Sequence, residues 1–427
     1  MKVSKLALAG SLMLVAAPLI LVPQAGAQEG KQEKQEQARL SREESAAIRP
    51  LSEAVRAQNW EAANAALAAA QAGAQSAAAR FEVGRLQLQI GSGTQNRDVQ
   101  IAGLEAMLAS TGAPASAMPT LLGGRASLAI QASDWTTAEQ RLTQFLELQP
   151  NNTERLFQLA EVKIALNKNN EALALYQRLL QALEAAGQQP TEQQLRRAVA
   201  LATDQRQAPL AAQLNERLLR AYPTTANWQT ALVAYRQSAG DEATLALDIR
   251  RLMRVAGVFA RAGDYVDFAS RLDRSGQWGE AKAVLDEGIA RGTVNATEPD
   301  VRQMLTSTAA RIREDRPQLA AMRTRALAAA TGREARIAGD THYGYGEYAA
   351  AAELYRAALQ KGGEDANLVN TRLGASLARA GQTAEAQAAF RAVTGARAPL
   401  AAYWLLWLER GAQQPAAQPA PAQPTQQ

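Results

Sequence analysis

Residues 153–185 read TERLFQLAEVKIALNKNNEALALYQRLLQALEA. Leu156, Leu159 and Ala160 precede the turn NKNN, and Ala172 and Tyr176 follow it, at the three- and four-residue spacing of one helix face. The stretch therefore predicts two amphipathic helices joined by a short turn. A lone helix pair could not bury such an apolar stripe, so the pattern also predicts neighbouring pairs that cover it.

The second half of this pattern recurs along the chain. An alanine that follows an aromatic or turn residue by three positions, and precedes a large apolar residue by four, occurs as Ala63, Ala138, Ala172, Ala281, Ala351 and Ala386. Gaps of 34 and 35 residues separate Ala138 from Ala172 and Ala351 from Ala386, and the other gaps are close to multiples of these. We expect degenerate copies at Ala102, Ala211, Ala246 and Ala320, which gives about ten tandem units.

These residues resemble the tetratricopeptide repeat family, in which a proline commonly closes each unit. Pro150 and Pro223 stand in that place, twelve residues after Ala138 and Ala211. The resemblance covers most of residues 41–411, is clear near 120–185, 265–290 and 335–395, and is weak over 80–115 and 290–330. It implies an all-α, right-handed superhelical solenoid of antiparallel helix pairs, whose first helices line a concave groove that receives a peptide or a helix of a partner.

The front of the chain has the pattern of an export signal. Lysines at positions 2 and 5 precede an apolar run over residues 6–22, and Ala25, Gly26 and Ala27 are the small residues that a signal peptidase requires. We predict a signal peptide over residues 1–27, cleaved on export to the bacterial periplasm, followed by a polar linker over 28–40. The alternative is that residues 6–22 stay as an inner-membrane anchor.

Composition narrows the possible functions. The sequence has no cysteine, which excludes disulfides, thiolate metal sites and cysteine nucleophiles. A formal net charge of +5 over 427 residues does not suggest a nucleic-acid-binding protein. Residues 412–427 carry no charge and consist mainly of Pro, Ala and Gln, so we expect this tail to be disordered.

The sequence offers little that could perform chemistry. His342 is the only histidine and lies where other units carry leucine, so we assign it to helix packing, with pH sensing or catalysis as the alternative. Acidic pairs such as Asp264 with Asp267, or Glu314 with Asp315, could in principle hydrolyse a glycoside, but such pairs decorate any helical surface. We predict no catalytic residue, no metal site and no cofactor.

Two other surface features could also bind a ligand. A series of arginines could bind an acidic polysaccharide, a phospholipid headgroup of a membrane surface or an acidic segment of a partner, although interleaved Glu314, Asp315 and Glu334 favour an ordinary helical face; it comprises Arg311, Arg313, Arg316, Arg323, Arg325, Arg333 and Arg336. Near the end, Trp404 and Trp407 belong to an apolar stretch that we assign to a final helix packed on the last repeat, with a docking surface as the alternative.

The family's groove geometry selects the candidate binding residues. Its concave positions lie fifteen, eleven and eight residues before each anchor alanine, which gives Phe157, Glu161, Ile164, Arg336, Asp340 and Tyr343. The lysine and asparagine with which one branch of the family grips a peptide C-terminus are absent from these positions.

We therefore predict a non-catalytic scaffold or adaptor in the bacterial periplasm. Its groove would bind a segment of another envelope protein, in envelope assembly or in the export of polysaccharide or protein. The alternatives are an exported enzyme that acts on cell-wall glycans and a membrane-anchored secretion subunit. Fold alone does not select among these pathways.

Overall fold

The computed structural model describes residues 40–240 and 242–413, which form helices and connecting turns without a strand. The predicted signal peptide, nearly all of the predicted linker and most of the predicted tail lie outside these residues. None of the described helices combines the length and the apolar character that a bilayer span needs. The chain divides between Ala115 and Ser116 into two compact units, a division that the repeat pattern does not predict.

The first unit consists of two helix pairs, with helices α1 (Arg42–Arg56), α2 (Trp60–Gly73), α3 (Ala77–Gly93) and α4 (Arg97–Ala109). Its core contains Ile48, Leu51, Leu86 and Ile90. Glu44 fixes the two pairs together, because its carboxylate accepts the backbone N–H of Ser41 at 2.9 Å and that of Ser76, which begins α3, at 2.6 Å.

Glycines bring α3 and α4 into close contact. A Cβ on Gly103 would lie 2.5 Å from the backbone nitrogen of Leu88 and 2.8 Å from the carbonyl oxygen of Gly84, so no larger residue fits there. Ala102, the anchor expected for this unit, is exposed, and that prediction is wrong. Gly103 makes the close approach instead, one residue further on, which the alanine-based alignment could not detect.

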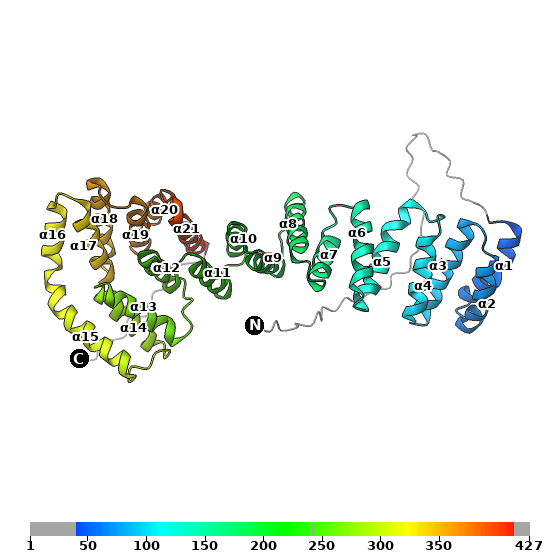
Figure 1. Ribbon diagram of the computed structural model, residues 1–427, viewed down its shortest axis with the longest axis horizontal. Helices are drawn as coiled ribbons and strands as arrows, with labels where there is room; N and C mark the ends of the chain where they lie inside the picture. Colours follow the sequence, from blue (N-terminus) through cyan, green and yellow to red (C-terminus); the bar gives the residue numbers. More distant parts are fainter. Residues whose placement is uncertain (1–39, 241, 414–427) are drawn as a thin grey trace. The chain divides into compact units, whose positions relative to one another are not determined.

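The second unit begins at Ser116 and contains the remaining helices: α5 (Met118–Gln131), α6 (Trp135–Leu148), α7 (Thr153–Ala165), α8 (Asn169–Ala185), α9 (Glu192–Asp204), α10 (Ala208–Ala221), α11 (Thr225–Ser238), α12 (Ala243–Val255), α13 (Ala262–Arg274), α14 (Trp278–Ala290), α15 (Pro299–Asp315), α16 (Leu319–Ala328), α17 (Gly332–Gly344), α18 (Tyr348–Lys361), α19 (Ala366–Arg379), α20 (Thr383–Arg391) and α21 (Ala398–Gln413). Figure 1 shows consecutive helices packed side by side in pairs. Regular pairs are α5 with α6, α7 with α8, α9 with α10, α13 with α14, α17 with α18, and α19 with α20.

One turn geometry joins the two helices of a regular pair. A residue with positive φ stands five positions before each anchor: Gln58, Ser133, Asn167, Arg206, Gly276, Gly346 and Gly381. Glycine adopts this left-handed conformation without steric cost, whereas each of the other residues adopts it at a conformational cost of roughly 1 kcal/mol. The six clear anchors and the weaker Ala211 are buried behind these turns. The predicted repeat register is thereby confirmed for the clear units.

Two of the clear pairs also place a glycine opposite an aromatic side chain. A Cβ on Gly374 of α19 would lie 2.6 Å from the Phe390 ring of α20, and one on Gly339 of α17 would lie 2.8 Å from the Tyr355 ring of α18. The aromatic side chain fills the space that the missing side chain leaves. These contacts set the spacing of the two helices.

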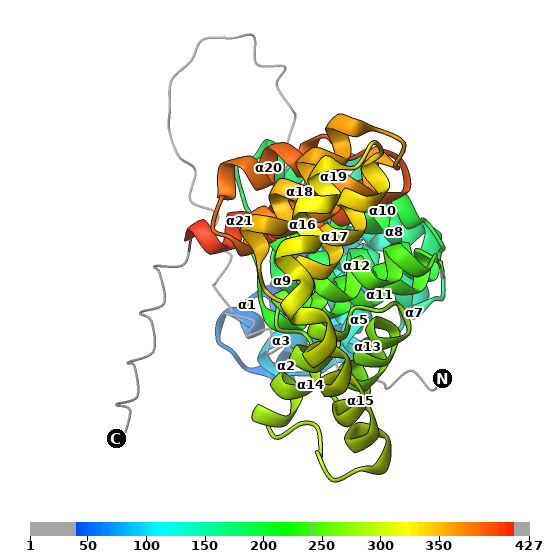
Figure 2. The same ribbon diagram turned by 90° about the vertical axis from the view of Figure 1, so that its left-hand side faces the viewer.

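Residues 290–330 depart from the pairing. Helices α15 and α16 follow each other end to end through a short 3-10 turn, Arg316–Gln318, and run as one bent arm from α14 to α17 in both Figure 1 and Figure 2. Ala320, expected as an anchor, is exposed, so this prediction is also wrong; α16 packs on α17 and α18 through Ala326 instead.

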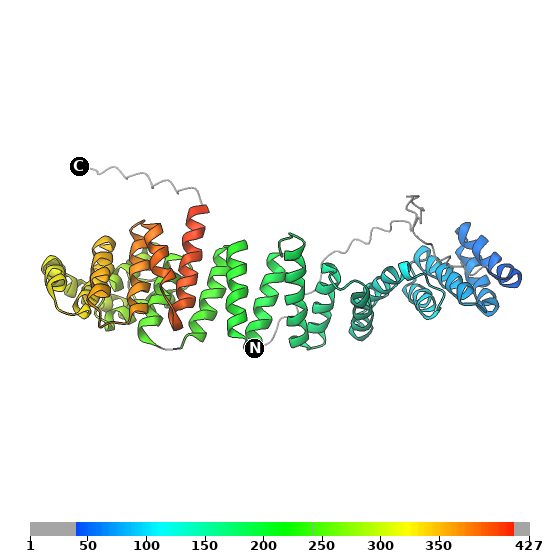
Figure 3. The same cartoon turned by 90° about the horizontal axis from the view of Figure 1, so that it is seen from above.

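The last helix closes the second unit on itself. Helix α21 packs on α20, as expected, where Trp404 stacks on Phe390 with ring centroids 5.5 Å apart. It also lies beside α10 and α11, where the ring of Tyr403 contacts those of Trp228 and Tyr235 (Figure 3). Helices α11 to α21 therefore form a closed arrangement, which the sequence did not predict.

Candidate partner-binding site

The candidate groove residues on α7 are half-buried and already engaged with their neighbours. Phe157 contacts the edge of the Tyr176 ring, with centroids 6.2 Å apart. Glu161 accepts a hydrogen bond from the Tyr176 hydroxyl at 2.5 Å and one from Arg197 at 3.3 Å. Burial and the nearby Glu161 raise the pKa of Tyr176, so its hydroxyl stays a donor. Ile164 completes this face of the helix.

The equivalent residues on α17 are more deeply placed. Asp340 is buried, and its carboxylate accepts hydrogen bonds from Tyr355 at 2.7 Å and from Arg372 at 2.7 Å. Asp340 and Tyr355 thus repeat the arrangement of the carboxylate and tyrosine in α7 and α8. Arg336 donates to Asp340 at 2.9 Å and to Glu364 at 2.5 Å. The oxygens of Asp340 are therefore committed to structural partners.

A buried ionic network occupies the centre of the closed part. Asp248 of α12, whose residue is 2% exposed, accepts hydrogen bonds from Arg251 at 2.9 Å, Arg372 at 3.2 Å and Arg397 at 2.7 Å. Arg372 lies on α19 and Arg397 lies just before α21. Arg372 and Arg397, which lie 124 and 149 positions after Asp248 in the sequence, thus both bind its carboxylate. This contact joins α12 to α19 and to the start of α21.

Each further charge in the network has a partner of opposite sign. Arg251 donates to Glu280 of α14 at 2.6 Å, and Arg372 bridges Asp248 and Asp340. Burial disfavours the ionised form of Asp248, but Arg372, Arg251 and Arg397 outweigh it, and the pKa of this carboxyl lies below its usual value. Burial similarly opposes the charge of Arg372, yet Asp248 and Asp340 raise the pKa of this guanidinium.

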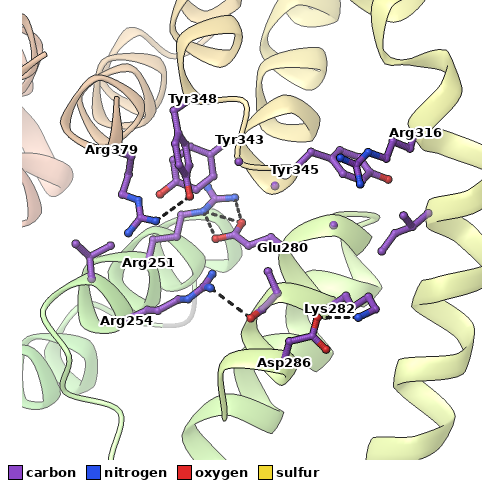
Figure 4. Close-up of a pocket in the computed structure, with 16 residues that line it drawn as sticks. Arg251, Arg254, Glu280, Lys282, Asp286, Arg316, Tyr343, Tyr345, Tyr348 and Arg379 are labelled. Atoms are coloured by element: carbon purple, nitrogen blue, oxygen red, sulfur yellow. Dashed lines mark hydrogen bonds and ion pairs between the residues drawn. The ribbon is translucent and has the colours of Figure 1, made fainter. Parts of the chain in front are cut away.

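A pocket of about 400 Å³ lies beside this network. It opens between α12, α14, the arm of α15 and α16, the α17 to α18 turn, and α19. Tyr343, one of the candidate groove residues, lines it; its ring lies 4.6 Å from the guanidinium carbon of Arg251. In Figure 4, Arg379 and Arg316 stand on opposite sides of the pocket.

Three of the cations that line the pocket are neutralised. Arg251 pairs with Glu280 at 2.6 Å, Lys282 with Asp286 at 2.7 Å, and Arg254 with Glu287 at 2.7 Å, the last carboxylate lying just outside the lining. Because these cations already have carboxylate partners, they attract an anionic ligand less strongly than unpaired cations would.

Two cations of the pocket have no carboxylate partner among the residues the structure describes: Arg316 and Arg379, both exposed. Arg379 instead donates to the Tyr348 hydroxyl at 3.0 Å and lies 4.9 Å from the centre of that ring. On the opposite wall, Tyr345 donates to Asp315 at 2.9 Å. The pocket thus presents two unpaired guanidinium groups between tyrosine rings.

The sequence pointed to only part of this pocket. It selected Tyr343 by groove position and Arg316 within the arginine series, but it did not select Arg379, Lys282 or Arg254. The tyrosine-rich tract HYGYGEY, residues 342–348, contains Tyr343, but its other two tyrosines, Tyr345 and Tyr348, were not selected. Its three tyrosines all line the pocket, which is the signal that could have identified it.

His342 is buried in the helix packing, 2% exposed. Its Nδ1 lies 2.6 Å from a carboxylate oxygen of Glu347, and its Nε2 has no hydrogen-bond partner within the described part of the chain. The residue does not line the pocket. Over residues 40–240 and 242–413, no group of His, Asp and Glu side chains is arranged to hold a metal ion.

The acidic pairs considered for glycoside hydrolysis have local roles. Asp267 accepts from Arg250 at 2.8 Å and from Arg271 at 3.0 Å, and Asp264 accepts the backbone N–H of Arg261 at the start of α13. Asp315 accepts from Tyr345. These carboxylates accept hydrogen bonds at a helix start, from arginines or from a tyrosine within the fold. Their arrangement does not support a catalytic carboxylate pair.

Comparison with known proteins agrees with the repeat architecture. Residues 129–184, which span α6, α7 and most of α8, match the family model described as tetratricopeptide repeat. No curated protein sequence matches the chain.

Three solved structures show partial similarity to the chain. A tetratricopeptide repeat protein from Parabacteroides merdae is 14% identical, with 63% of this chain and 100% of that chain covered and a TM-score of 0.29. The complex of Naa15/Naa10 with HypK-THB is 14% identical, with 83% and 63% covered and a TM-score of 0.36. The Cut9-Hcn1 hetero-tetramer of APC/C is 13% identical, with 88% and 84% covered and a TM-score of 0.22.

Proposed function

Because the chain is a tetratricopeptide-repeat protein, we propose that it is a non-catalytic protein-binding scaffold of the bacterial envelope. Tandem helix pairs of this kind serve protein–protein interaction, and stacked repeats present extended surfaces for it. The partner we propose is a segment of another envelope protein, bound by side chains of the first helices and of the turns between pairs.

The observation that carries the proposal is the pocket beside Tyr343. In the closed part, buried ion pairs fill the interior around Asp248, so an extended peptide has no continuous groove to follow there. The remaining opening admits a few side chains of a partner. A partner segment would therefore insert an anchoring group into this pocket and spread over the exposed helix faces around it.

The envelope location is part of the proposal and rests on the sequence. Two lysines, the apolar run over residues 6–22 and the small residues before Gln28 have the order of an export signal. Cell fractionation, with mass spectrometry of the protein's N-terminus, tests it. An N-terminus at Gln28 in the periplasmic fraction is expected, and an intact N-terminus in the membrane fraction would favour the anchored form.

Affinity capture with a pair of matched variants tests the binding function. The full chain, Arg379→Glu and Arg313→Glu are each used to capture proteins from an envelope extract. Both arginines are exposed, but only Arg379 lines the pocket. A discrete protein retained by the wild type and by Arg313→Glu, and lost with Arg379→Glu, is expected. If all three proteins capture the same set, the pocket is not the working surface.

A further inference from the structure

We infer that the pocket between α12, α14, α17 and α19 binds an acidic peptide segment, with Arg316 and Arg379, on opposite sides of the pocket, each open to a carboxylate of the peptide. This inference rests on the proposed scaffold function and names the chemistry of the partner at that site. It differs from the known peptide clamp of the family, whose lysine and asparagine are absent here.

The first argument is the imbalance of hydrogen-bonding groups. The carboxylates of Glu280 and Asp286 that line the pocket are already paired with Arg251 and Lys282. Arg316 and Arg379 have no such partner among the residues described here, and guanidinium groups only donate hydrogen bonds. The lining therefore lacks a free acceptor for its donors, and an anionic oxygen ligand would supply one.

The Tyr343 hydroxyl adds a third donor. It makes no hydrogen bond to another residue of the described chain, although Tyr343 lines the pocket. Burial and the nearby Glu280 raise the pKa of Tyr343, so the hydroxyl keeps its proton at neutral pH. The two guanidinium groups and this hydroxyl give the pocket three donors that suit the carboxylates of an acidic peptide.

Arg379 and Tyr343 are held in place before any ligand arrives. The guanidinium of Arg379 lies over the Tyr348 ring and is hydrogen-bonded to its hydroxyl, and the Tyr348 ring contacts the edge of Tyr343 with centroids 5.2 Å apart. Gly279 lets the opposite wall approach, because a Cβ there would lie 2.9 Å from the Tyr345 ring. Such preorganisation reduces the ordering cost of binding.

The apolar part of the lining favours a peptide over an anionic glycan. Val255, Ala283 and Ile312 line the pocket together with the tyrosine rings. An acidic peptide can place an apolar or aromatic side chain beside its carboxylate and contact both kinds of surface, whereas a glycan acid has little apolar surface to bury. A volume of about 400 Å³ accommodates a few such side chains and not a folded domain.

Peptide selection tests the inference without knowledge of the natural partner. A phage library of short random peptides is selected on the immobilised full chain, and one selected peptide is synthesised with a fluorescein label. Its affinity is measured by fluorescence anisotropy for the wild type, for Arg316→Gln combined with Arg379→Gln, for Tyr343→Phe and for the control Arg313→Gln. Polygalacturonate serves as a competitor of glycan chemistry. Circular dichroism melts confirm that each variant is folded.

We expect selected peptides rich in Asp and Glu, whose affinity falls at least about tenfold in the double arginine variant and stays unchanged in Arg313→Gln. Tyr343→Phe should weaken binding by several-fold, and added salt should weaken wild-type binding. Acidic peptides that bind the double variant as tightly as the wild type would refute the site but leave the scaffold function standing. Neutral or basic selected peptides would refute the ligand chemistry. Arginine-dependent binding of polygalacturonate, with no peptide selected, would replace the peptide by a glycan and count against both proposals.

Discussion

Replacing Asp248 by Asn should destabilise the second unit by about 3–5 kcal/mol, since one member of a buried ionic network loses its charge. Three guanidinium groups donate to this carboxylate, and a hydrogen bond to a charged group contributes about 1.5–3 kcal/mol. The three contributions do not add in full. Arg251 keeps Glu280, Arg372 keeps Asp340 and Arg397 keeps the more exposed Glu242, so the loss stays well below the sum of the three contributions.

Urea denaturation followed by circular dichroism at neutral pH measures this change. Glu353→Gln is the matched control, because it breaks the exposed ion pair with Arg323 and should cost less than about 1 kcal/mol. A loss in Asp248→Asn as small as in the control would show that the network does not hold α12, α19 and the start of α21 together.

The pH dependence of the same variant supplies a second readout. The pKa of Asp248 is lowered in the folded protein, so its contribution is fully present above the unfolded pKa near 3.9 and is lost as pH falls through the folded value. The difference in stability between wild type and Asp248→Asn should stay constant from neutral pH down to about pH 4 and shrink below it. A difference that vanished already near pH 6 would contradict the assignment.

Three other predictions concern the packing. Ala172→Leu should cost about 1–3 kcal/mol, because Ala172 has no exposed surface and a larger side chain must displace a neighbouring helix; a thermal melt measures it. Trp404→Ala should cost about 3–5 kcal/mol in urea denaturation, since it removes the stack on Phe390 and opens a cavity under α21. Glu44→Gln should remove an acid sensitivity of the first unit, measured as its unfolding between neutral pH and pH 2. The backbone N–H groups of Ser41 and Ser76 lower the pKa of Glu44 to about 2, so the wild type loses this contribution only as pH falls toward that value.

The regular helix pairs could be predicted because their signal is local. A small residue, a turn and an alanine recur within about one repeat length, and each contact joins residues close in sequence. The register held for Ala138, Ala172 and Ala351 for this reason. It failed at Ala102, where the left-handed turn residue Gln95 places the anchor position at Gln100, and at Ala320, where the chain departs from the regular pairing.

The closure and the pocket could not be predicted because they depend on distant residues. Asp248 binds Arg372 and Arg397, which lie more than a hundred residues further along the chain. Nothing in the sequence distinguishes such buried charged residues from those on a solvated helix surface. The predicted packing of the Trp404 stretch on the last repeat is confirmed. The second contact of this stretch, with α11, has no local sequence signal. The pocket depends on that closure, and only its tyrosines were visible as a cluster.

The central claim, that the protein binds another protein at the pocket, is tested most directly by site-specific photo-crosslinking in living cells. A benzoylphenylalanine is placed at Tyr345, which lines the pocket, and separately at Gln181, an exposed position on α8 outside the pocket. We expect one discrete protein adduct from position 345 that is absent from position 181 and diminished when Arg379 is changed to Glu. No adduct from position 345, or the same adducts from both positions, would contradict the claim.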